Sequence, residues 1–278
     1  LANQHQKDEW LNKIINGEMQ STLAFTEPQS RFQLNDVATT ANKKEGNFIL
    51  NGKKSFVLNG SESDLIIVPA RTSGSQTDLK GITLFAVKKD SSGIEMNSYK
   101  SVDGRSAAEI KLNNVSVSSD SIIGEIDNGY DALEATVDEA TLAICAEATG
   151  IMKSLHDKTV EYSKNRVQFG IPIGGFQALQ HRMVDTLMAC EETESILLWA
   201  ITTEQDDKSA LKKAISGLKY QIGTAGKHVG QEAVQLHGGM GISWELDIAH
   251  LFKRLSAIEI LFGNADFHMK RFIELSNV

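Results

Sequence analysis

Three short segments carry residue types suited to a close approach to an anionic ligand. Residues 235–242 (QLHGGMGI) end a long amphipathic helical pattern, and their glycines let backbone amides come close to a bound group. Residues 25–28 (FTEP) lie near the start of the chain, and residues 165–170 (NRVQFG) lie in its middle. A glycine-rich turn alone more often only reverses the chain. The specificity therefore lies in the order and spacing of all three segments.

In this order and at this spacing, the segments resemble the acyl-CoA dehydrogenase family of flavoproteins. The resemblance covers essentially all of the chain. It implies FAD as the cofactor and oxidation of the Cα–Cβ bond of an acyl-CoA thioester. In that reaction a glutamate removes the α-proton, while the β-hydrogen leaves as hydride to the flavin. The resemblance also implies an electron-transfer flavoprotein as the electron acceptor.

Four residues are expected at the flavin ring if the resemblance holds. Phe25 and Thr26 match the family strand whose backbone and hydroxyl meet the flavin pyrimidine. Phe56 and Leu58 match the strand beside the ring, where an aromatic commonly stacks. Phe56 is equally compatible with a core aromatic in a strand. Leu58 departs from the family, which usually places a hydroxyl residue there to hydrogen-bond the N5 edge of the flavin.

A second set of residues matches the positions that hold the adenine half of FAD from a neighbouring subunit in family members. These are Arg166, Phe169, Gln177, Gln235, Gly238 and Gly239. An arginine pairs with pyrophosphate, and glycines let main-chain N–H groups approach it. If these positions work as in relatives, each FAD site spans two chains. The resemblance thus implies a homo- or hetero-oligomer, either a dimer or a tetramer.

The usual catalytic base is missing from this sequence. Family members commonly carry it as the glutamate of a Tyr-Glu-Gly-Thr loop, and the matching residues 261–266 read LFGNAD, which puts Gly263 at that position. Some relatives carry the base on the first bundle helix instead, where the counterpart is Ala140. Neither side chain can accept a proton.

Three carboxylates are alternative candidates for the base. Glu139 adjoins the second family position, but a step of one residue turns a side chain by about 100° around a helix. Glu147 lies on the same face about two turns further on, within the apolar stretch ICAEA, and is the favoured candidate. Asp266 follows the first family position. Each has a structural alternative: Glu139 as a solvated helix residue, Glu147 as a partner of Arg166 or Arg182, and Asp266 as a helix N-cap.

A further departure lies beside the first segment. Residues 29–33 read QSRFQ, where most family members have a glycine-rich loop (GAGSD) near the thioester. With the FGNAD stretch, this looks like the small-subunit branch of paired acyl-CoA dehydrogenases, such as pimeloyl-CoA dehydrogenase small subunits. The leading interpretation is an acyl-CoA dehydrogenase or a subunit of one. The alternative is a non-catalytic subunit that completes a partner's FAD site. Relatives that use flavin for oxygenation or nitro-group oxidation are a third possibility.

Composition excludes other classes of partner. The 278 residues carry a formal net charge of −8, with a pI near 5.4, which argues against nucleic acid or an anionic membrane as the main partner. No apolar run is long enough to span a bilayer. Cys145 and Cys190 stand without metal spacing and fit a reducing compartment, so the cytoplasm is expected.

The elements that must position these residues fall into three regions. Residues 1–20 are expected to be the remnant of an N-terminal helical domain that is otherwise missing, either by truncation or because the numbering starts where order begins. Residues 21–127 show short β-rich runs, which predicts a flavin-facing antiparallel barrel or sandwich, with Asn51-Gly52 as a hairpin turn. Residues 128–278 show helical periodicity, which predicts an antiparallel four-helix bundle with the FAD and oligomer interface.

The helical period also predicts where the later helices lie. The first follows residue 128 and ends before Pro172. The others are expected at about residues 176–205, at about 208–236 and from about 245 onward. The fold class predicted from the sequence is therefore α+β, with a β-domain followed by a helical bundle.

Overall fold

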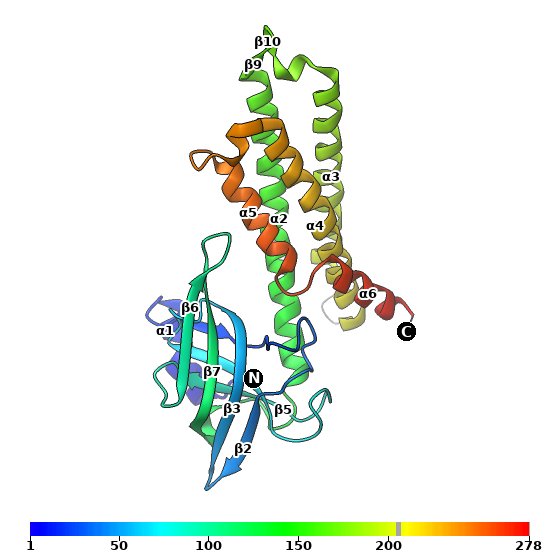
Figure 1. The fold of residues 1–278 in the computed structure, drawn as a ribbon. Helices are drawn as coiled ribbons and strands as arrows, with labels where there is room; N and C mark the ends of the chain where they lie inside the picture. The colour runs from blue at the N-terminus through cyan, green and yellow to red at the C-terminus, as the bar shows by residue number, and fades with distance from the viewer. Residues whose placement is uncertain (204–206, 278) are drawn as a thin grey trace. The chain divides into compact units, whose positions relative to one another are not determined.

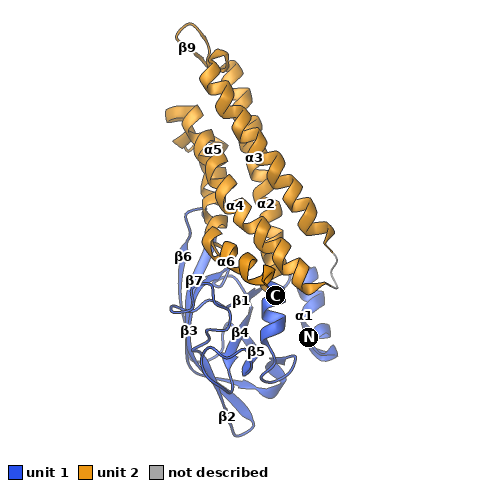
Figure 2. Ribbon diagram, turned by 90° about the vertical axis from the view of Figure 1, so that its right-hand side faces the viewer, with its two compact units in different colours: residues 1–136 blue, residues 137–278 orange. Residues whose placement is uncertain are grey.

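The computed structural model describes residues 1–203 and 207–277 and divides into two compact units. Unit 1 comprises Leu1–Thr136 and unit 2 comprises Val137–Val278 (Figure 2). Each unit has its own hydrophobic core. The expected end of one helix near residue 205 lies outside the described residues.

Unit 1 begins with a helix and continues as a sheet. Helix α1 (Gln4–Ile15) starts with a capping box, in which Asn3 and Gln6 accept each other's backbone N–H. Gln6 is buried and also donates to the carbonyls of Asp120 and Ile122, which ties α1 to the end of the sheet. The strands are β1 (Ser21–Leu23), β2 (Thr40–Lys44), β3 (Asn47–Leu58), β4 (Leu65–Arg71), β5 (Ile82–Lys88), β6 (Ile94–Lys100), β7 (Ser106–Ser118) and β8 (Ile122–Ile123), with the 3₁₀ helix η1 (Ser119–Ser121) before β8.

The sheet has eight strands in the order β6-β7-β3-β2-β4-β5-β8, with β1 paired to β4. The α+β class is confirmed, but the prediction of a purely antiparallel barrel or sandwich is wrong. Strand β4 runs parallel to both β1 and β2, and β6 and β8 lie at the two ends of the order, so no barrel closes among the described strands. The long connection between β1 and β2 returns the chain in the same direction, and the residue pattern within a strand does not reveal this.

The predicted hairpin turn at Asn51-Gly52 is also wrong. Strand β3 runs unbroken through both residues and pairs with β7, with register shifts after Leu50 and after Lys54. A Cβ on Gly52 would lie 2.3 Å from Thr39 Oγ1, so the glycine is required by close packing. The turn between β2 and β3 is instead at residues 45 and 46, where both backbone φ angles are positive.

Unit 2 is helical. Helix α2 (Tyr130–Asn165) begins in the last residues of unit 1 and supplies the first helix of unit 2. The further elements are β9 (Val167–Gln168), β10 (Ile171–Pro172), η2 (Ile173–Gly175), α3 (Gln177–Thr202), α4 (Lys208–His237), η3 (Gly238–Ile242), α5 (Asp247–Ile260) and α6 (Ala265–Ser276). Within the unit, the small β9–β10 hairpin lies at the end where α2 passes into α3 (Figure 1).

The core of unit 2 lies along α4, which packs against α3, α5 and α6. Glycines on α4 permit this close packing: a Cβ on Gly230 would lie 2.9 Å from the Phe252 ring, and one on Gly223 would lie 2.8 Å from the Cβ of Ala265. The prediction of four helices missed α6. Helix α5 ends at Ile260, residues 262 and 263 have positive φ, and Asn264 caps α6 by accepting the N–H of Phe267.

No helix within residues 1–203 and 207–277 combines the length and the apolar character that a bilayer span requires.

An ion pair lies inside the core of unit 1. Lys54 Nζ donates to Glu27 Oε1 at 2.6 Å and to the carbonyl of Pro69 at 2.7 Å, and its side chain is 0 % exposed. Glu27 also accepts the backbone N–H groups of Ala38 and Thr39. All the charges of this pair are therefore compensated by direct hydrogen bonds.

Lys54→Met should lower the free energy of unfolding by about 3–5 kcal/mol, because it leaves the Glu27 carboxylate buried without its counter-charge. Urea denaturation measures the change. The matched control is Lys53→Met, since Lys53 is the exposed neighbour, whose contact with Glu109 is 3.4 Å long. The control should change the free energy by less than about 1 kcal/mol. Equal losses in the two variants would contradict the role assigned to the buried pair.

Candidate functional site

The segment 25–28 leaves β1 and crosses beside β3. The N–H of Ala24 donates to the Ile67 carbonyl, and the N–H of Ser55 donates to the Thr26 carbonyl, both at 2.8 Å. Thr22 Oγ1 donates to the Leu58 carbonyl at 2.6 Å. The structure thus brings together the segments that hold Phe25, Thr26, Phe56 and Leu58. Phe56 is exposed, and the other three side chains are partly buried.

Glu27 anchors this segment. Burial alone would raise the pKa of Glu27, but the charge of Lys54 and the hydrogen bonds from Lys54, Thr39 and Gln29 hold that pKa below its ordinary value. The carboxylate is therefore ionised and holds the loop of residues 28–39 against β3 and β4. The buried Ser30 closes this loop by donating to the Glu27 carbonyl.

Phe56 is held in an exposed and strained position. It lies at the second register shift of β3 and has φ +50°, a backbone conformation that residues other than glycine adopt at a cost in conformational energy. Its ring is 38 % exposed. Glu109 on β7 fixes the bulge, because its carboxylate accepts the Phe56 N–H (3.2 Å), the Ser55 hydroxyl (3.0 Å) and the Tyr99 hydroxyl (3.1 Å). An aromatic face is thereby presented at the sheet surface.

The adenine-site candidates of the middle segment lie on the β9–β10 hairpin and at the start of α3. Phe169 has φ +56° and is 92 % exposed, with its ring edge-on to Phe176 at 6.2 Å. Arg166 is exposed, and the Arg166 guanidinium makes no hydrogen bond or ion pair within the described chain. Gln177 is the exposed first residue of α3. An arginine and an aromatic ring at the hairpin, and an amide at the start of α3, are thus available to a ligand.

The glycine turn follows α4. Gly238 has φ +60° and ψ −139°, a conformation suited only to glycine. A Cβ at Gly238 or Gly239 would meet no atom within 4 Å, so the backbone there is open to a ligand. Gln235 is exposed one turn earlier. The same segment is tied to α2, because His237 stacks on Tyr162 at 4.2 Å.

A cavity of about 390 Å³ lies beside this stack. Its lining includes Asn165 at the end of α2, Tyr162 and His237, together with residues 245–248. The glycine turn and the hairpin of Arg166 therefore belong to the same end of unit 2. Burial lowers the pKa of His237, whose Nδ1 faces the Ala233 carbonyl at 2.8 Å.

The favoured base candidate, Glu147, is paired. Arg254 on α5 donates to both carboxylate oxygens of Glu147, with Nε to Oε1 at 2.7 Å and Nη2 to Oε2 at 2.6 Å. The expectation that Arg166 or Arg182 would be its partner is wrong. Arg182 instead pairs with Glu232 on α4 at 2.5 Å. The sequence indicated that Glu147 could be paired with an arginine. The structure shows that the arginine is Arg254, which lies on a helix far away in the sequence.

The other positions considered for the catalytic base differ in their burial and in their contacts. Glu139 is exposed and Ala140 is partly buried on α2. The adjacent Asp138 is the buried carboxylate: Arg271 on α6 donates to both of its oxygens, at 2.6 and 2.8 Å. Asp266 is not the N-cap of α6, because Asn264 fills that role. Asp266 lies in the first turn of α6, where its negative charge interacts favourably with the helix dipole.

A buried lysine holds the turn that contains Gly263. Lys219 Nζ donates to the carbonyls of Glu259 (2.9 Å) and Gly263 (2.6 Å). Burial lowers the pKa of Lys219 to about 8, while Cys145 and Glu259 oppose the shift. Burial also raises the pKa of the Cys145 thiol to about 12, so that thiol stays protonated.

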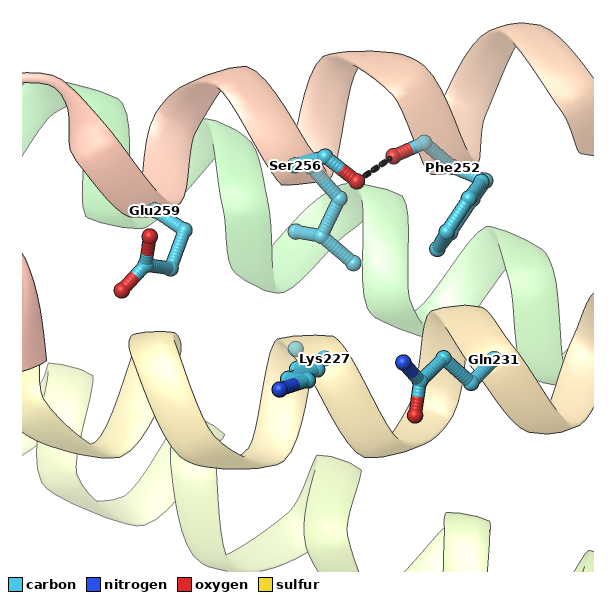
Figure 3. A pocket seen from close by; sticks show the side chains of 7 residues that line it. Lys227, Gln231, Phe252, Ser256 and Glu259 are labelled. Atoms are coloured by element: carbon cyan, nitrogen blue, oxygen red, sulfur yellow. Dashed lines mark hydrogen bonds between the residues drawn. The ribbon is translucent and has the colours of Figure 1, made fainter.

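A second cavity, of about 280 Å³, opens between α4 and α5 (Figure 3). Lys227 and Gln231 reach it from α4, and Phe252, Ser256 and Glu259 reach it from α5. None of the site residues predicted from the sequence lines it. No group of His, Cys, Asp or Glu suited to a metal ion occurs in the described part of the chain.

Sequence reasoning missed the supporting residues Lys54, Glu109, Arg254 and Lys219. A signal existed for Lys54, since alternation from Phe48 and Leu50 puts even-numbered residues of β3 on the buried face. A lysine on that face needs a counter-charge. The others act across elements far apart in the sequence, so no local pattern indicates them.

Known proteins resemble the whole chain. The family "Acyl-CoA dehydrogenase, middle domain" matches residues 22–115, and "Acyl-CoA dehydrogenase, C-terminal domain" matches residues 127–274. A 3-(aryl)acrylate reductase of Clostridium sporogenes is 30 % identical over 96 % of this chain and 71 % of its own length.

Solved structures of similar proteins agree with these matches. An acyl-CoA dehydrogenase of Geobacillus kaustophilus has a TM-score of 0.93 at 26 % identity, covering 99 % of this chain and 73 % of that one. The FAD complex of PigA has a TM-score of 0.93 at 25 % identity, covering 99 % and 72 %.

The buried lysine predicts a pH dependence of stability. The Lys219 pKa is about 8 in the folded chain, against an ordinary value of 10.5. Between these values only the unfolded chain holds the extra proton, so the contribution of Lys219 to stability rises with pH. The neutral amine keeps two N–H groups for the two carbonyls.

The Tm of the wild type minus that of Lys219→Met should therefore increase from pH 7 to pH 10. Calorimetry in a pH series measures it. Lys227→Met is the control on the same helix, because Lys227 is exposed and should give a difference that stays flat. A wild-type advantage over Lys219→Met that falls with pH would rule out a buried lysine of lowered pKa.

Proposed function

Because the chain belongs to the acyl-CoA dehydrogenase family, we propose that it works with FAD in the α,β-dehydrogenation of an acyl-CoA thioester and that electrons pass to an electron-transfer flavoprotein. The family uses FAD, and PigA, with the same fold, is solved as an FAD complex. The chain spans 71 % of its Clostridium relative and 65 % of the human short-chain enzyme, so the activity of the whole protein is part of the proposal.

The observation that carries the proposal is the match between unpartnered groups and the parts of FAD. Gly238 and Gly239 leave backbone open at a helix end, and Arg166 has no partner side chain in the described chain. Both suit a pyrophosphate. Phe56 presents an aromatic ring on a bulge of the sheet, beside the segment of Thr26. These groups are of the types that a pyrophosphate and a flavin ring require from a protein.

The residues of unit 1 have separate roles at the flavin ring in this proposal. FAD, when bound, supplies the acceptor for the β-hydrogen of the thioester. Phe25 and Thr26 offer backbone and hydroxyl groups to the pyrimidine edge, and Phe56 forms a wall beside the ring. Leu58 offers no hydroxyl to the N5 edge, so that edge keeps one hydrogen bond fewer than in most relatives.

The adenine half of FAD is assigned to the second set. Arg166, Phe169 and Gln177 act with Gln235 and the two glycines on the FAD of a neighbouring subunit. The protein is accordingly an oligomer, either of this chain or with a second kind of subunit.

Removal of the α-proton is assigned to Glu147 if the chain acts alone. The expectation that Gly263 stands at the usual base position is wrong, because LFGN set against Tyr-Glu-Gly-Thr puts Phe262 at the glutamate and Gly263 at the glycine. Phe262 and Ala140, which hold the two usual positions, have no proton acceptor. Each Glu147 oxygen accepts an N–H from the Arg254 guanidinium, so a proton taken up by Glu147 would weaken that ion pair.

The second candidate function is a non-catalytic subunit that completes the FAD site of a catalytic partner. The tight Glu147–Arg254 pair favours it, as does the lack of a carboxylate at residues 140 and 262. The flavin-facing residues of unit 1 favour the catalytic function instead.

Anaerobic bleaching of the flavin absorbance by a panel of acyl-CoA thioesters separates the two functions. Bleaching by the protein alone, lost in Glu147→Gln, would establish a self-sufficient enzyme with Glu147 as its base. Bleaching only with a large-subunit partner, and unchanged in Glu147→Gln, would establish the supporting subunit. Bleaching by the protein alone that survives in Glu147→Gln would contradict the assignment of Glu147.

Arg166→Met should weaken FAD binding by at least about tenfold, because it removes the charge assigned to the pyrophosphate. Equilibrium dialysis of flavin measures the Kd. Lys164→Met is the matched control, since Lys164 is an exposed cation two residues away that already contacts Glu161. Identical Kd values for Arg166→Met and the wild type would remove Arg166 from the site.

A further inference from the structure

We propose that Glu109 is a positioning residue of the flavin site, which holds the bulge of β3 so that the Phe56 ring stands at the sheet surface as a wall for the flavin. The inference rests on the proposed function, because it adds one residue to the same site. The hold of Glu109 on the bulge concerns only unit 1 and does not depend on a bound flavin.

The bulge changes which residues of β3 face the core. Lys54 pairs with Ile110 of β7 and Val57 pairs with Ala108, so β3 uses one residue more than β7 between these two pairs. A regular strand would place Lys54 and Val57 on opposite faces, since they lie three residues apart. The extra residue lets both be buried, while Phe56 between them remains 38 % exposed.

Packing alone does not hold Phe56 in this conformation. Its φ of +50° is strained for a residue with a side chain, and such strain persists only where the surroundings over-determine it. The Phe56 ring lies 6.3 Å from the Tyr99 ring, centroid to centroid, at an interplanar angle of 43°. Because more than a third of Phe56 is exposed, this contact covers only part of the ring. The backbone therefore needs a hydrogen-bonding partner.

The Glu109 carboxylate is that partner. Its Oε1 accepts the Phe56 N–H at 3.2 Å and the Tyr99 hydroxyl at 3.1 Å. Its Oε2 accepts the Ser55 hydroxyl at 3.0 Å and lies 3.4 Å from Lys53 Nζ. Three of these four donors belong to the bulged segment of β3. An ionised carboxylate only accepts hydrogen bonds, so a single side chain satisfies all four donors.

The ionisation of both side chains fixes the direction of these hydrogen bonds. Burial alone would raise the pKa of Glu109, but the hydrogen bonds from its four donors hold that pKa below its ordinary value. Burial, together with the hydrogen bond and the charge of Glu109, raises the pKa of Tyr99. At neutral pH the carboxylate is therefore charged, and the phenol keeps the proton that it donates.

Glu109 thus acts on the flavin through Phe56. Without the carboxylate, the strained backbone of the bulge is free to relax, and the Phe56 ring leaves the position that the proposed function assigns to the wall. The strain at Phe56 and the acceptors of Glu109 consequently belong to one device, which aims an aromatic side chain outward from a sheet.

Glu109→Leu should weaken FAD binding by the full-length protein at least about tenfold, because the donors of the bulge lose their charged acceptor. Equilibrium dialysis measures the Kd. Glu95→Leu is the matched control, since Glu95 is an exposed carboxylate on the neighbouring strand β6, 3.5 Å from Lys111. The control should change the Kd by less than about threefold. Equal Kd values for the two variants would overturn the inference.

Visible circular dichroism of the bound flavin reports the surroundings of the ring, which a general loss of stability does not change. At saturating FAD, Glu109→Leu should alter the flavin band because the wall has moved. Glu109→Gln should keep the wild-type band and a Kd within about threefold of the wild type, since its amide oxygen still accepts hydrogen bonds. A wild-type band in Glu109→Leu, or no rescue by Glu109→Gln, would overturn the inference.

Glu109→Asp decides the question if Glu109→Leu does not fold. Aspartate keeps the charge but is one carbon shorter, so its carboxylate cannot reach all four donors of an unchanged backbone. FAD binding should weaken at least about threefold, because hydrogen bonds to the bulge are lost while the charge remains. A Kd equal to that of the wild type would overturn the inference.

Hydrogen exchange of the Phe56 amide in the flavin-free protein, followed by NMR, separates this inference from the proposed function. Exchange should be at least about tenfold faster in Glu109→Leu than in the wild type, and unchanged in Glu95→Leu, because only the first removes the acceptor of that N–H. Equal rates would overturn the hold of Glu109 on the bulge. A wild type that binds no FAD would contradict the proposed function, while the exchange rates would still decide whether Glu109 holds the bulge.

Discussion

The buried ion pair between Glu27 and Lys54 is the interaction on which the part of unit 1 that holds Thr26 and Phe56 depends. A charge inside a core is tolerated only when direct hydrogen bonds replace its water. Here the Glu27 carboxylate accepts hydrogen bonds from two backbone N–H groups and from the Lys54 ammonium group. The ammonium group also donates to the Pro69 carbonyl. Three separate parts of the chain consequently meet at one point. The Thr26 carbonyl then reaches Ser55, next to the strained residue Phe56.

Unit 2 uses the same principle between its helices. Lys219 holds the carbonyls at the end of α5, and Arg271 joins α6 to Asp138 of α2. Arg254 joins α5 to Glu147 of α2. These cations lie inside a chain whose total charge is negative. Because each one bridges elements far apart in sequence, helices α5 and α6 are positioned by charge as well as by apolar packing.

The sequence predicted much of the fold because periodicity is a local property. The start of α4 at Lys208 was predicted directly, and the start of α3 and the end of α4 each lie one residue from the predicted limits. The parallel pairing of β1 with β4 and the role of Gly52 were missed, since both depend on contacts between distant segments. For the site, motif order predicted the residues, but only the structure showed that Glu147 is bound by Arg254. Pairing across helices has no sequence signature.

The bound flavin per chain, measured from the absorbance spectrum and protein concentration of the full-length protein after gel filtration, tests the central claim most directly. The open glycine turn, the unpartnered Arg166 and the exposed Phe56 predict about one FAD per chain in an oligomer. A colourless protein that takes up no FAD, either alone or with a second subunit, would contradict the assignment of these residues to a flavin site.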